Sequence, residues 1–275
     1  MVEAAGEEAF FTVAGDELIP APHARGPWAP DMMHGRLLGG LMARAIEREH
    51  ASEDLHVARL TVDLFRRVGM VPLRVTTRRV RDGGRVRVAD AAVTTADGEV
   101  ARASAVLLRR GAPPPGELWT TPNWDAPGPD ELGPPMNGAA FHLWPLAGQA
   151  AAGGAGPAGP PPTPDDVWQS AARRRAWIRE AHELVDGESA SPLVRVALAA
   201  DVTSPLTLYG TAGLYYINAD YTLTLGRLPV SEAIGLESAG HLADDGVAVA
   251  HCTMYDSAGP IGFCSVTAVA TGRLS

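Results

Sequence analysis

One carboxylate of this sequence stands where it could act on a bound molecule. Asp220 lies in the segment 214–225, which is otherwise largely apolar and includes Asn218 and two threonines. Burial among apolar residues raises the pKa of a carboxyl group, and such a carboxylate can orient a water molecule and accept its proton. The threonine hydroxyls or Asn218 could hold that water. The structural alternative is that Asp220 points outward from a strand or caps a turn.

Donors for a developing negative charge could come from the start of a predicted helix. Backbone N–H groups in a first helical turn have no partner within the helix, and at Gly35 no Cβ obstructs their approach to a ligand. His34 could add a side-chain donor; its alternative role is a helix N-cap without chemistry. Gly39, further along the same predicted helix, lowers its helix propensity. It indicates either a close approach by a backbone or ligand, or loose helix packing.

Other chemistries lack the residues they need. All basic residues apart from histidine are arginine, so Schiff-base catalysis and Walker-type nucleotide binding have no lysine. The eight histidines show no spacing suited to a metal, and no GxGxxG motif follows a strand, so we expect no metal and no cofactor. The segment 235–240 has one residue too many for a GxSxG elbow. With a net charge of −9 and scattered arginines, we expect no nucleic-acid partner.

Two stretches share one order of elements, a helix followed by strands. The first helix is predicted over residues 34–50, because apolar residues recur there at helical spacing. The stripe consists of Leu38, Leu41, Met42, Ala45 and Ile46. Ser191, a capping residue, precedes Pro192 and predicts a second helix that continues to about Val202. Partly alternating segments predict strands at residues 55–66, 73–81, 85–95, 100–110, 214–225, 233–241, 247–255 and 261–271.

The expected fold class is α+β, with each antiparallel sheet wrapped round a central helix. We expect an N-terminal domain over residues 1–111, a proline-rich connector over 112–138 and a C-terminal domain over 139–275. Trp119 and Trp124 should pin the connector by aromatic burial, whereas the Ala-Gly-Pro-rich residues 149–164 should be mobile. Cys252 and Cys264 lie equally far from a predicted turn. They should face each other across a hairpin as free thiols.

Several motifs, taken together and in their order along the chain, resemble those of the double-hotdog acyl-CoA thioesterases of the TesB-like and actinobacterial branch. These motifs are Gly26-Pro27-Trp28, His34-Gly35, Asp186-Gly187-Glu188, Ser191-Pro192-Leu193, Asn218 to Leu223, Arg227-Leu228-Pro229 and Gly259 to Gly262. The resemblance covers most of the chain. It implies two fused hotdog domains, with a site at the interface between them. It also implies thioester hydrolysis, in which coenzyme A is the leaving group and not a cofactor.

The resemblance also implies a catalytic set: an aspartate early in the second repeat, a hydroxyl in the next strand and a glutamine in the last. Asp220 is assigned to the first position. The hydroxyl position falls near Ser238, Ala239 or Gly240, with His241 beside them, and Thr267 stands where the family has glutamine. His241 is either a catalytic residue or a satisfied histidine at the end of a strand. These residues therefore join the candidate site.

The phosphates of coenzyme A should meet arginines near a helix start, with Arg36, Arg25 and the cluster 173–175 as candidates. The alternative is that these arginines are solvated surface charges. The leading expectation is hydrolysis of a medium or long fatty acyl-CoA, held in an apolar tunnel along the helix. The missing glutamine suggests the alternative of a non-catalytic acyl-CoA-binding protein. An acyl-CoA hydratase or dehydratase is a third possibility, but it would need a histidine paired with an acid.

The chain carries three glutamates and no basic residue in its first eight positions, and no apolar run long enough to cross a bilayer. We therefore expect a cytoplasmic protein without a membrane partner. Exposed sheet edges could drive assembly into a homo-oligomer.

Overall fold

The N-terminal half follows the predicted order of one helix and a strand meander. The structure is a computed structural model that describes residues 8–137, 140–146 and 168–271. A hairpin and a short 3-10 helix come first: β1 (Phe11–Ala14), β2 (Glu17–Pro20) and η1 (Pro22–Ala24). The helix and its meander are α1 (Gly35–His50), β3 (Leu55–Asp63), β4 (Arg74–Asp82), β5 (Val86–Thr95) and β6 (Gly98–Arg109). The predicted helix and all four strands are confirmed within three residues at each end.

The C-terminal half repeats this layout with a broken helix. The connector contains η2 (Pro129–Glu131), and three strands precede the helices: β7 (Met136–Asn137), β8 (Phe141–Leu146) and β9 (Arg175–Glu180). The helices are α3 (Pro192–Ala200) and α4 (Thr203–Leu208). The strands that follow are β10 (Tyr209–Gly210), β11 (Gly213–Leu214), β12 (Tyr216–Asn218), β13 (Asp220–Leu225), β14 (Ile234–Asp244), β15 (Val247–Asp256) and β16 (Gly259–Ala270). As predicted, Ser191 caps α3, and its Oγ accepts a hydrogen bond from Val194 N at 3.2 Å.

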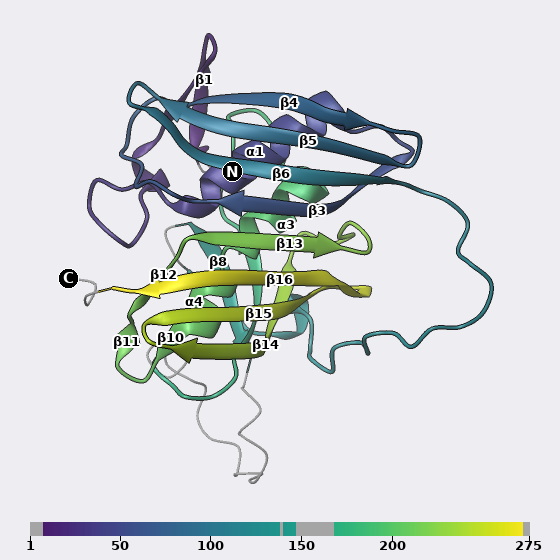
Figure 1. The fold of residues 1–275 in the computed structure, drawn as a ribbon. Coiled ribbons are helices and arrows are strands. Elements are labelled where there is room, and N and C mark those ends of the chain that lie inside the picture. The colour runs from purple at the N-terminus through teal and green to yellow at the C-terminus, as the bar shows by residue number, and fades with distance from the viewer. Residues whose placement is uncertain (1–7, 138–139, 147–167, 272–275) are drawn as a thin grey trace, which may run out of the picture.

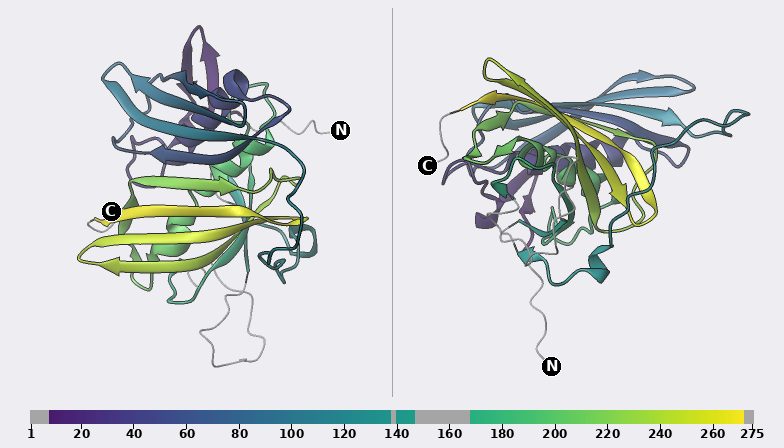
Figure 2. Two further views of the ribbon diagram at one scale, coloured as in Figure 1. Left: turned by 45° about the vertical axis from the view of Figure 1, so that its right-hand side comes forward. Right: turned by 90° about the horizontal axis from the view of Figure 1, so that it is seen from below.

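One antiparallel sheet joins the two halves. Its strands follow the order β4-β5-β6-β3-β13-β16-β15-β14-β9-β8-β7, and β3 pairs with β13 at the junction (Figure 1). The sheet curves, and α1, α3 and α4 lie on its concave side (Figure 2). The helices of the two halves therefore lie beside each other behind the junction, where α1 packs on α3. This arrangement is the fold class predicted from the sequence.

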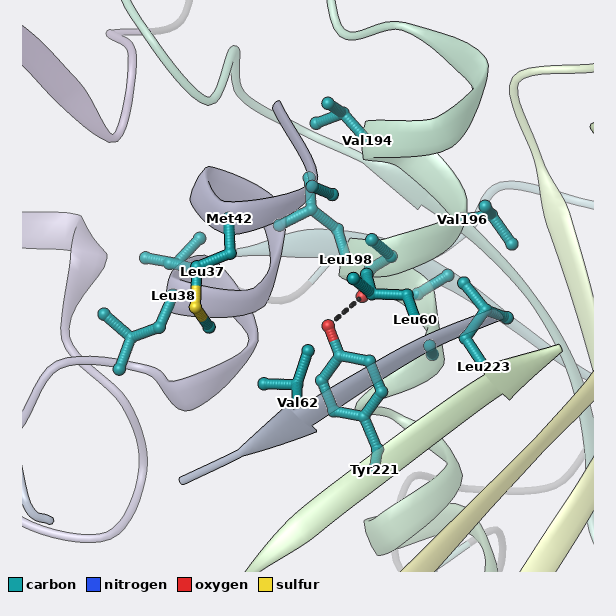
Figure 3. Close-up of a cluster of buried hydrophobic side chains, with 14 of the residues drawn as sticks. Leu37, Leu38, Met42, Leu60, Val62, Val194, Val196, Leu198, Tyr221 and Leu223 are labelled. Atoms are coloured by element: carbon teal, nitrogen blue, oxygen red, sulfur yellow. Dashed lines mark hydrogen bonds between the residues drawn. The ribbon is translucent and has the colours of Figure 1, made fainter. Parts of the chain in front are cut away.

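The glycines of α1 allow this close packing. A Cβ on Gly39 would lie 1.9 Å from the hydroxyl oxygen of Tyr221, and a Cβ on Gly40 would lie 2.6 Å from a methyl of Leu198. The Tyr221 hydroxyl donates a hydrogen bond to Ala197 O at 3.0 Å, within a cluster that includes Leu60 (Figure 3). The close approach predicted at Gly39 is therefore made by a side chain and not by a ligand. The space expected for an acyl tunnel along the helix is filled.

The connector is held by one of its two tryptophans. Trp124 stacks on Tyr255, with ring centroids 4.8 Å apart, and also contacts Trp177. Trp119 is 88% exposed, so the prediction that both tryptophans pin the connector is wrong for Trp119. The segment 149–164, expected to be mobile, lies outside the described residues.

The two cysteines occupy directly opposed positions on β15 and β16, as predicted. Cys252 and Cys264 are register partners, and both are buried free thiols. Burial raises the pKa of Cys252 to about 12, and it raises that of Cys264 as well. A high thiol pKa leaves little reactive thiolate at neutral pH. Neither cysteine is therefore a candidate nucleophile.

Candidate functional site

An apolar cavity of about 550 Å³ opens between the start of α1 and the α3–α4 junction. It is lined by Arg25, Gly26, Pro27, Trp28, His34, Ala140, Phe141, Trp168, Asp201, Val202, Ser204, Pro205, Tyr209, Leu214 and Asn218. A smaller cavity of about 230 Å³ adjoins it and includes Gly35, Leu38, Leu64 and Val68. Both are lined by Trp28, His34, Asp201 and Asn218. These four residues therefore stand where the two cavities meet.

Asp201 is the carboxylate of this site. It follows α3 directly as its C-cap, and only 7% of its surface is exposed. Asn218 Nδ2 donates a hydrogen bond to Asp201 Oδ1 at 2.8 Å and thereby fixes its orientation. Burial raises the pKa of Asp201, although the Asn218 bond and the positive charge of Arg36 oppose this rise. Asp201 is thus a desolvated carboxylate in an apolar cavity, which is the environment of a general base.

His34 lines both cavities as the N-cap residue of α1, and its side chain makes no capping hydrogen bond. Burial and, to a smaller extent, the Arg36 charge lower the pKa of His34 to about 3. The imidazole is therefore neutral at physiological pH and carries one donor and one acceptor nitrogen. The Gly35 backbone N–H begins the first turn beside it. His34 and Gly35 therefore both line the smaller cavity, close to Asp201.

Asp220 lies on the other face of the sheet. Along β13, Tyr221, Leu223 and Leu225 are buried towards the helices, which places Asp220 on the outer face. One carboxylate oxygen of Asp220 accepts a hydrogen bond from the Thr267 backbone N–H at 2.7 Å. The expected burial beside a helix is therefore wrong. Asp220 was interpreted either as a carboxylate that activates water or as a residue that points outward from a strand. Its position matches the second interpretation.

Thr267 is also separated from the cavity. It is exposed on β16, on the outer face with Asp220. Its contact with Asp220 runs through its backbone and not through its hydroxyl. The two family positions assigned to these residues are thus adjacent, but they are not beside Asp201.

Ser238, Gly240 and His241 line a different cavity, of about 600 Å³, that shares only Tyr209 with the cavity at Asp201. The buried Ser238 hydroxyl donates to Leu206 O at 3.4 Å. A Cβ on Gly240 would lie 2.4 Å from the ring of His251, so packing explains this glycine. The structure does not bring these three residues to the buried carboxylate.

Arg36 is a buried ion-pair partner and not a phosphate ligand. Its side chain is 0% exposed, and Nη1 donates to both carboxylate oxygens of Glu180 at 2.7 Å. Nη2 donates to Ala140 O at 3.0 Å, and the guanidinium lies over the Phe10 and Phe141 rings. Both readings of Arg36 from the sequence, as a phosphate ligand and as a solvated charge, are therefore corrected. The pair instead ties α1 to β9 of the other half.

The sequence analysis missed Asp201, although a signal for it was present. In the apolar run from Leu193 to Val202, Asp201 is the only acidic residue. That is the same signal on which Asp220 was chosen. Asn218, predicted to bind substrate or to hold a water at Asp220, lines the cavity, and its side chain donates to Asp201.

Within residues 8–137, 140–146 and 168–271, no three His, Cys, Asp or Glu side chains gather to hold a metal ion. None of the described helices is long and apolar enough to cross a membrane.

Comparison with protein-family models assigns both halves of the chain. The model of the acyl-CoA thioesterase N-terminal domain matches residues 24–108, and that of the C-terminal domain matches residues 120–269. The chain belongs to the acyl-CoA thioesterase family. It is a thioester hydrolase, and the predicted resemblance to TesB-like thioesterases is confirmed. No curated protein matches the sequence.

Solved structures share the fold of this thioesterase at low sequence identity. The tesB protein of Mycobacterium avium subspecies paratuberculosis is 13% identical, with a TM-score of 0.65 over 95% of this chain and 96% of that one. A conserved hot dog fold protein of unknown function from Alicyclobacillus acidocaldarius is 14% identical, with a TM-score of 0.68 over 96% of both chains. The acyl-CoA thioesterase II TesB2 of Mycobacterium marinum is 16% identical, with a TM-score of 0.59 over 86% of this chain and 90% of that one. These likenesses support the double-hotdog fold.

Proposed function

We propose that this thioesterase hydrolyses an acyl-CoA in the cavity at Asp201, and that Asp201 is the base that activates water. The observation that carries the proposal is a desolvated carboxylate in an apolar cavity, held in orientation by Asn218. Such a carboxylate has a raised pKa and accepts a proton more readily than one in bulk water. Asp201 thus takes the role that the sequence analysis assigned to Asp220.

The reaction needs three contributions from the chain. Asp201 takes a proton as the oxygen of a water molecule attacks the thioester carbonyl carbon. The neutral His34 ring and the Gly35 backbone N–H lie at the same cavities and can donate to the carbonyl oxygen as negative charge develops there. When the C–S bond breaks, the proton held by Asp201 goes to the sulfur of coenzyme A. The products are the free acid and coenzyme A.

The two cavities provide a path for each arm of the substrate. The coenzyme A arm is thin and flexible, and it suits the smaller cavity, whose lining includes Arg66 and Arg67. Arg66 is exposed, and Arg67 pairs with the exposed Asp31, so both guanidinium groups lie at the surface. Arginine is well suited to bind phosphate. The acyl group then occupies the larger cavity on the other side of Asp201.

A thiol-release assay over a series of acyl-CoA substrates tests the role of Asp201. In Asp201→Asn the Asn218 hydrogen bond can persist, because the new amide oxygen accepts it, but the base is lost. We expect kcat to fall by about 10² to 10⁴, the usual contribution of a general base. The matched control is Asp220→Asn, which removes a carboxylate on the outer face, and its kcat should stay within about threefold of wild type.

The opposite ranking of the two variants would return the catalytic role to Asp220. Binding of an acyl-CoA without turnover by the wild-type chain would instead support the alternative of a non-catalytic acyl-CoA-binding protein.

A further inference from the structure

We propose that the acyl group carries an aromatic ring and is not a long linear chain. This inference rests on the proposed hydrolysis at Asp201, because it assigns the larger cavity to the acyl group. It concerns the substrate class and corrects the expectation of a fatty acyl-CoA.

Side chains fill the space that faces the glycines of α1. Tyr221 of β13 fills the position opposite Gly39, and Leu198 of α3 fills the one opposite Gly40. Tyr221, Leu198 and Leu60 are each at most 1% exposed. They belong to one cluster of buried side chains (Figure 3). An alkyl chain that entered along the helix at Gly39 and Gly40 would have to displace these buried side chains, and protein interiors are close-packed. The acyl group must therefore fit the cavity beside α4.

Aromatic side chains form the walls of that cavity. Trp28, Phe141, Trp168 and Tyr209 are four of its fifteen lining residues, whereas 6% of the whole chain is aromatic. All four are only partly buried and pack with one side against the main core. Part of their remaining surface lines the cavity. The Trp168 and Tyr209 rings lie with centroids 5.7 Å apart at an angle of 42°.

Such walls suit a flat ring better than a flexible chain. Aromatic rings attract one another in offset or edge-on arrangements, in addition to the area that they bury. Two prolines, Pro27 and Pro205, add rigid apolar surface to the lining. A rigid ring also loses less conformational freedom on binding than an alkyl chain with many rotatable bonds. At equal carbon number, the cavity therefore favours an aromatic acyl group.

Phenylacetyl-CoA and octanoyl-CoA provide a matched test, because each acyl group has eight carbons. We expect kcat/KM for phenylacetyl-CoA to exceed that for octanoyl-CoA by about tenfold, and palmitoyl-CoA to be the poorest substrate of the three. Trp168→Leu should lower kcat/KM for phenylacetyl-CoA by about tenfold and that for octanoyl-CoA by less than about threefold. Trp168→Phe should retain most of the preference. The control Trp119→Leu removes a tryptophan that is 88% exposed and should change neither value.

Two results would overturn the inference. The first is a kcat/KM for octanoyl-CoA or palmitoyl-CoA equal to or above that for phenylacetyl-CoA, which would leave hydrolysis at Asp201 intact. The second is a weaker inhibition by free coenzyme A in Trp168→Leu, because the aromatic walls would then bind the adenine and not the acyl group. If no thioester is cleaved, the proposed function fails by itself. Calorimetric binding of phenylacetyl-CoA against octanoyl-CoA then decides the ring preference.

Discussion

Replacing Gly39 by alanine places a methyl group where α1 faces Tyr221. The new Cβ would lie 1.9 Å from the Tyr221 hydroxyl oxygen and 2.8 Å from the ring carbon that carries it. Tyr221 is completely buried, and its hydroxyl donates to Ala197 O, so the ring cannot turn away without losing that bond. The substitution therefore separates two explanations of Gly39: room for a ligand, or room for Tyr221.

The expected cost follows from three contributions. Overpacking a core costs about 1–3 kcal/mol. Loss of the buried hydroxyl bond costs about 1–3 kcal/mol. Alanine in place of glycine returns about 1 kcal/mol of helix propensity. We therefore expect Gly39→Ala to lower the free energy of unfolding by about 1–5 kcal/mol, which for a chain of this size corresponds to a fall in Tm of about 2–9 °C.

Urea unfolding of the single and double variants measures this cost. Tyr221→Phe removes the oxygen of the 1.9 Å contact, so the double variant with Gly39→Ala should be more stable than the sum of the single effects predicts, by about 1 kcal/mol or more. Gly111→Ala is the control, because nothing lies within 4 Å of its added Cβ. It should change the stability by less than about 0.5 kcal/mol.

A stable Gly39→Ala variant with a strongly raised KM would refute this reasoning, since it would mean that the methyl group displaces substrate and not Tyr221. Additive effects in the double variant would argue against the Tyr221 contact as the cause.

Three further outcomes follow from the buried charges. Burial raises the pKa of Asp201, so the stability that its neutral form contributes is lost as pH rises through that pKa and the carboxylate becomes charged. Asn at this position stays neutral, so Asp201→Asn should have a higher Tm than wild type at pH 7, but not at pH 3. The pKa of His34 is about 3 in the folded protein and about 6.5 in the unfolded chain, so the wild type loses stability as pH falls below about 6.5. Relative to wild type, the free energy of unfolding of His34→Gln, measured in urea, should rise by about 1.4 kcal/mol for each pH unit between pH 6 and 4. Glu180→Gln leaves the Arg36 charge buried without its counter-charge, and equilibrium unfolding should show a loss of about 3 kcal/mol. Equal stability of variant and wild type at pH 7 for Asp201→Asn, between pH 6 and 4 for His34→Gln, or in the unfolding of Glu180→Gln would contradict the corresponding burial.

The fold class and most element positions could be predicted from the amino-acid sequence. Apolar residues at helical spacing located α1, and Ser191 before Pro192 located the start of α3, because both signals act within a few residues of chain. The opposition of Cys252 and Cys264 followed from a single hairpin. The alternation of Tyr221, Leu223 and Leu225 also indicated that Asp220 points outward, although the resemblance favoured the opposite interpretation.

Which carboxylate lies in the cavity depends on the packing of the two halves. Asp201 and Asp220 both stand in apolar segments, but only Asp201 lines the cavity, whose lining residues come from both halves of the chain. The ion-pair partner of Arg36 could not be predicted from the sequence either, because Glu180 lies 144 residues away along the chain. Local periodicity reports which face of an element is buried. Whether a charged group is buried, and which residues it contacts, depends on contacts between distant segments, which form only when the two halves pack together.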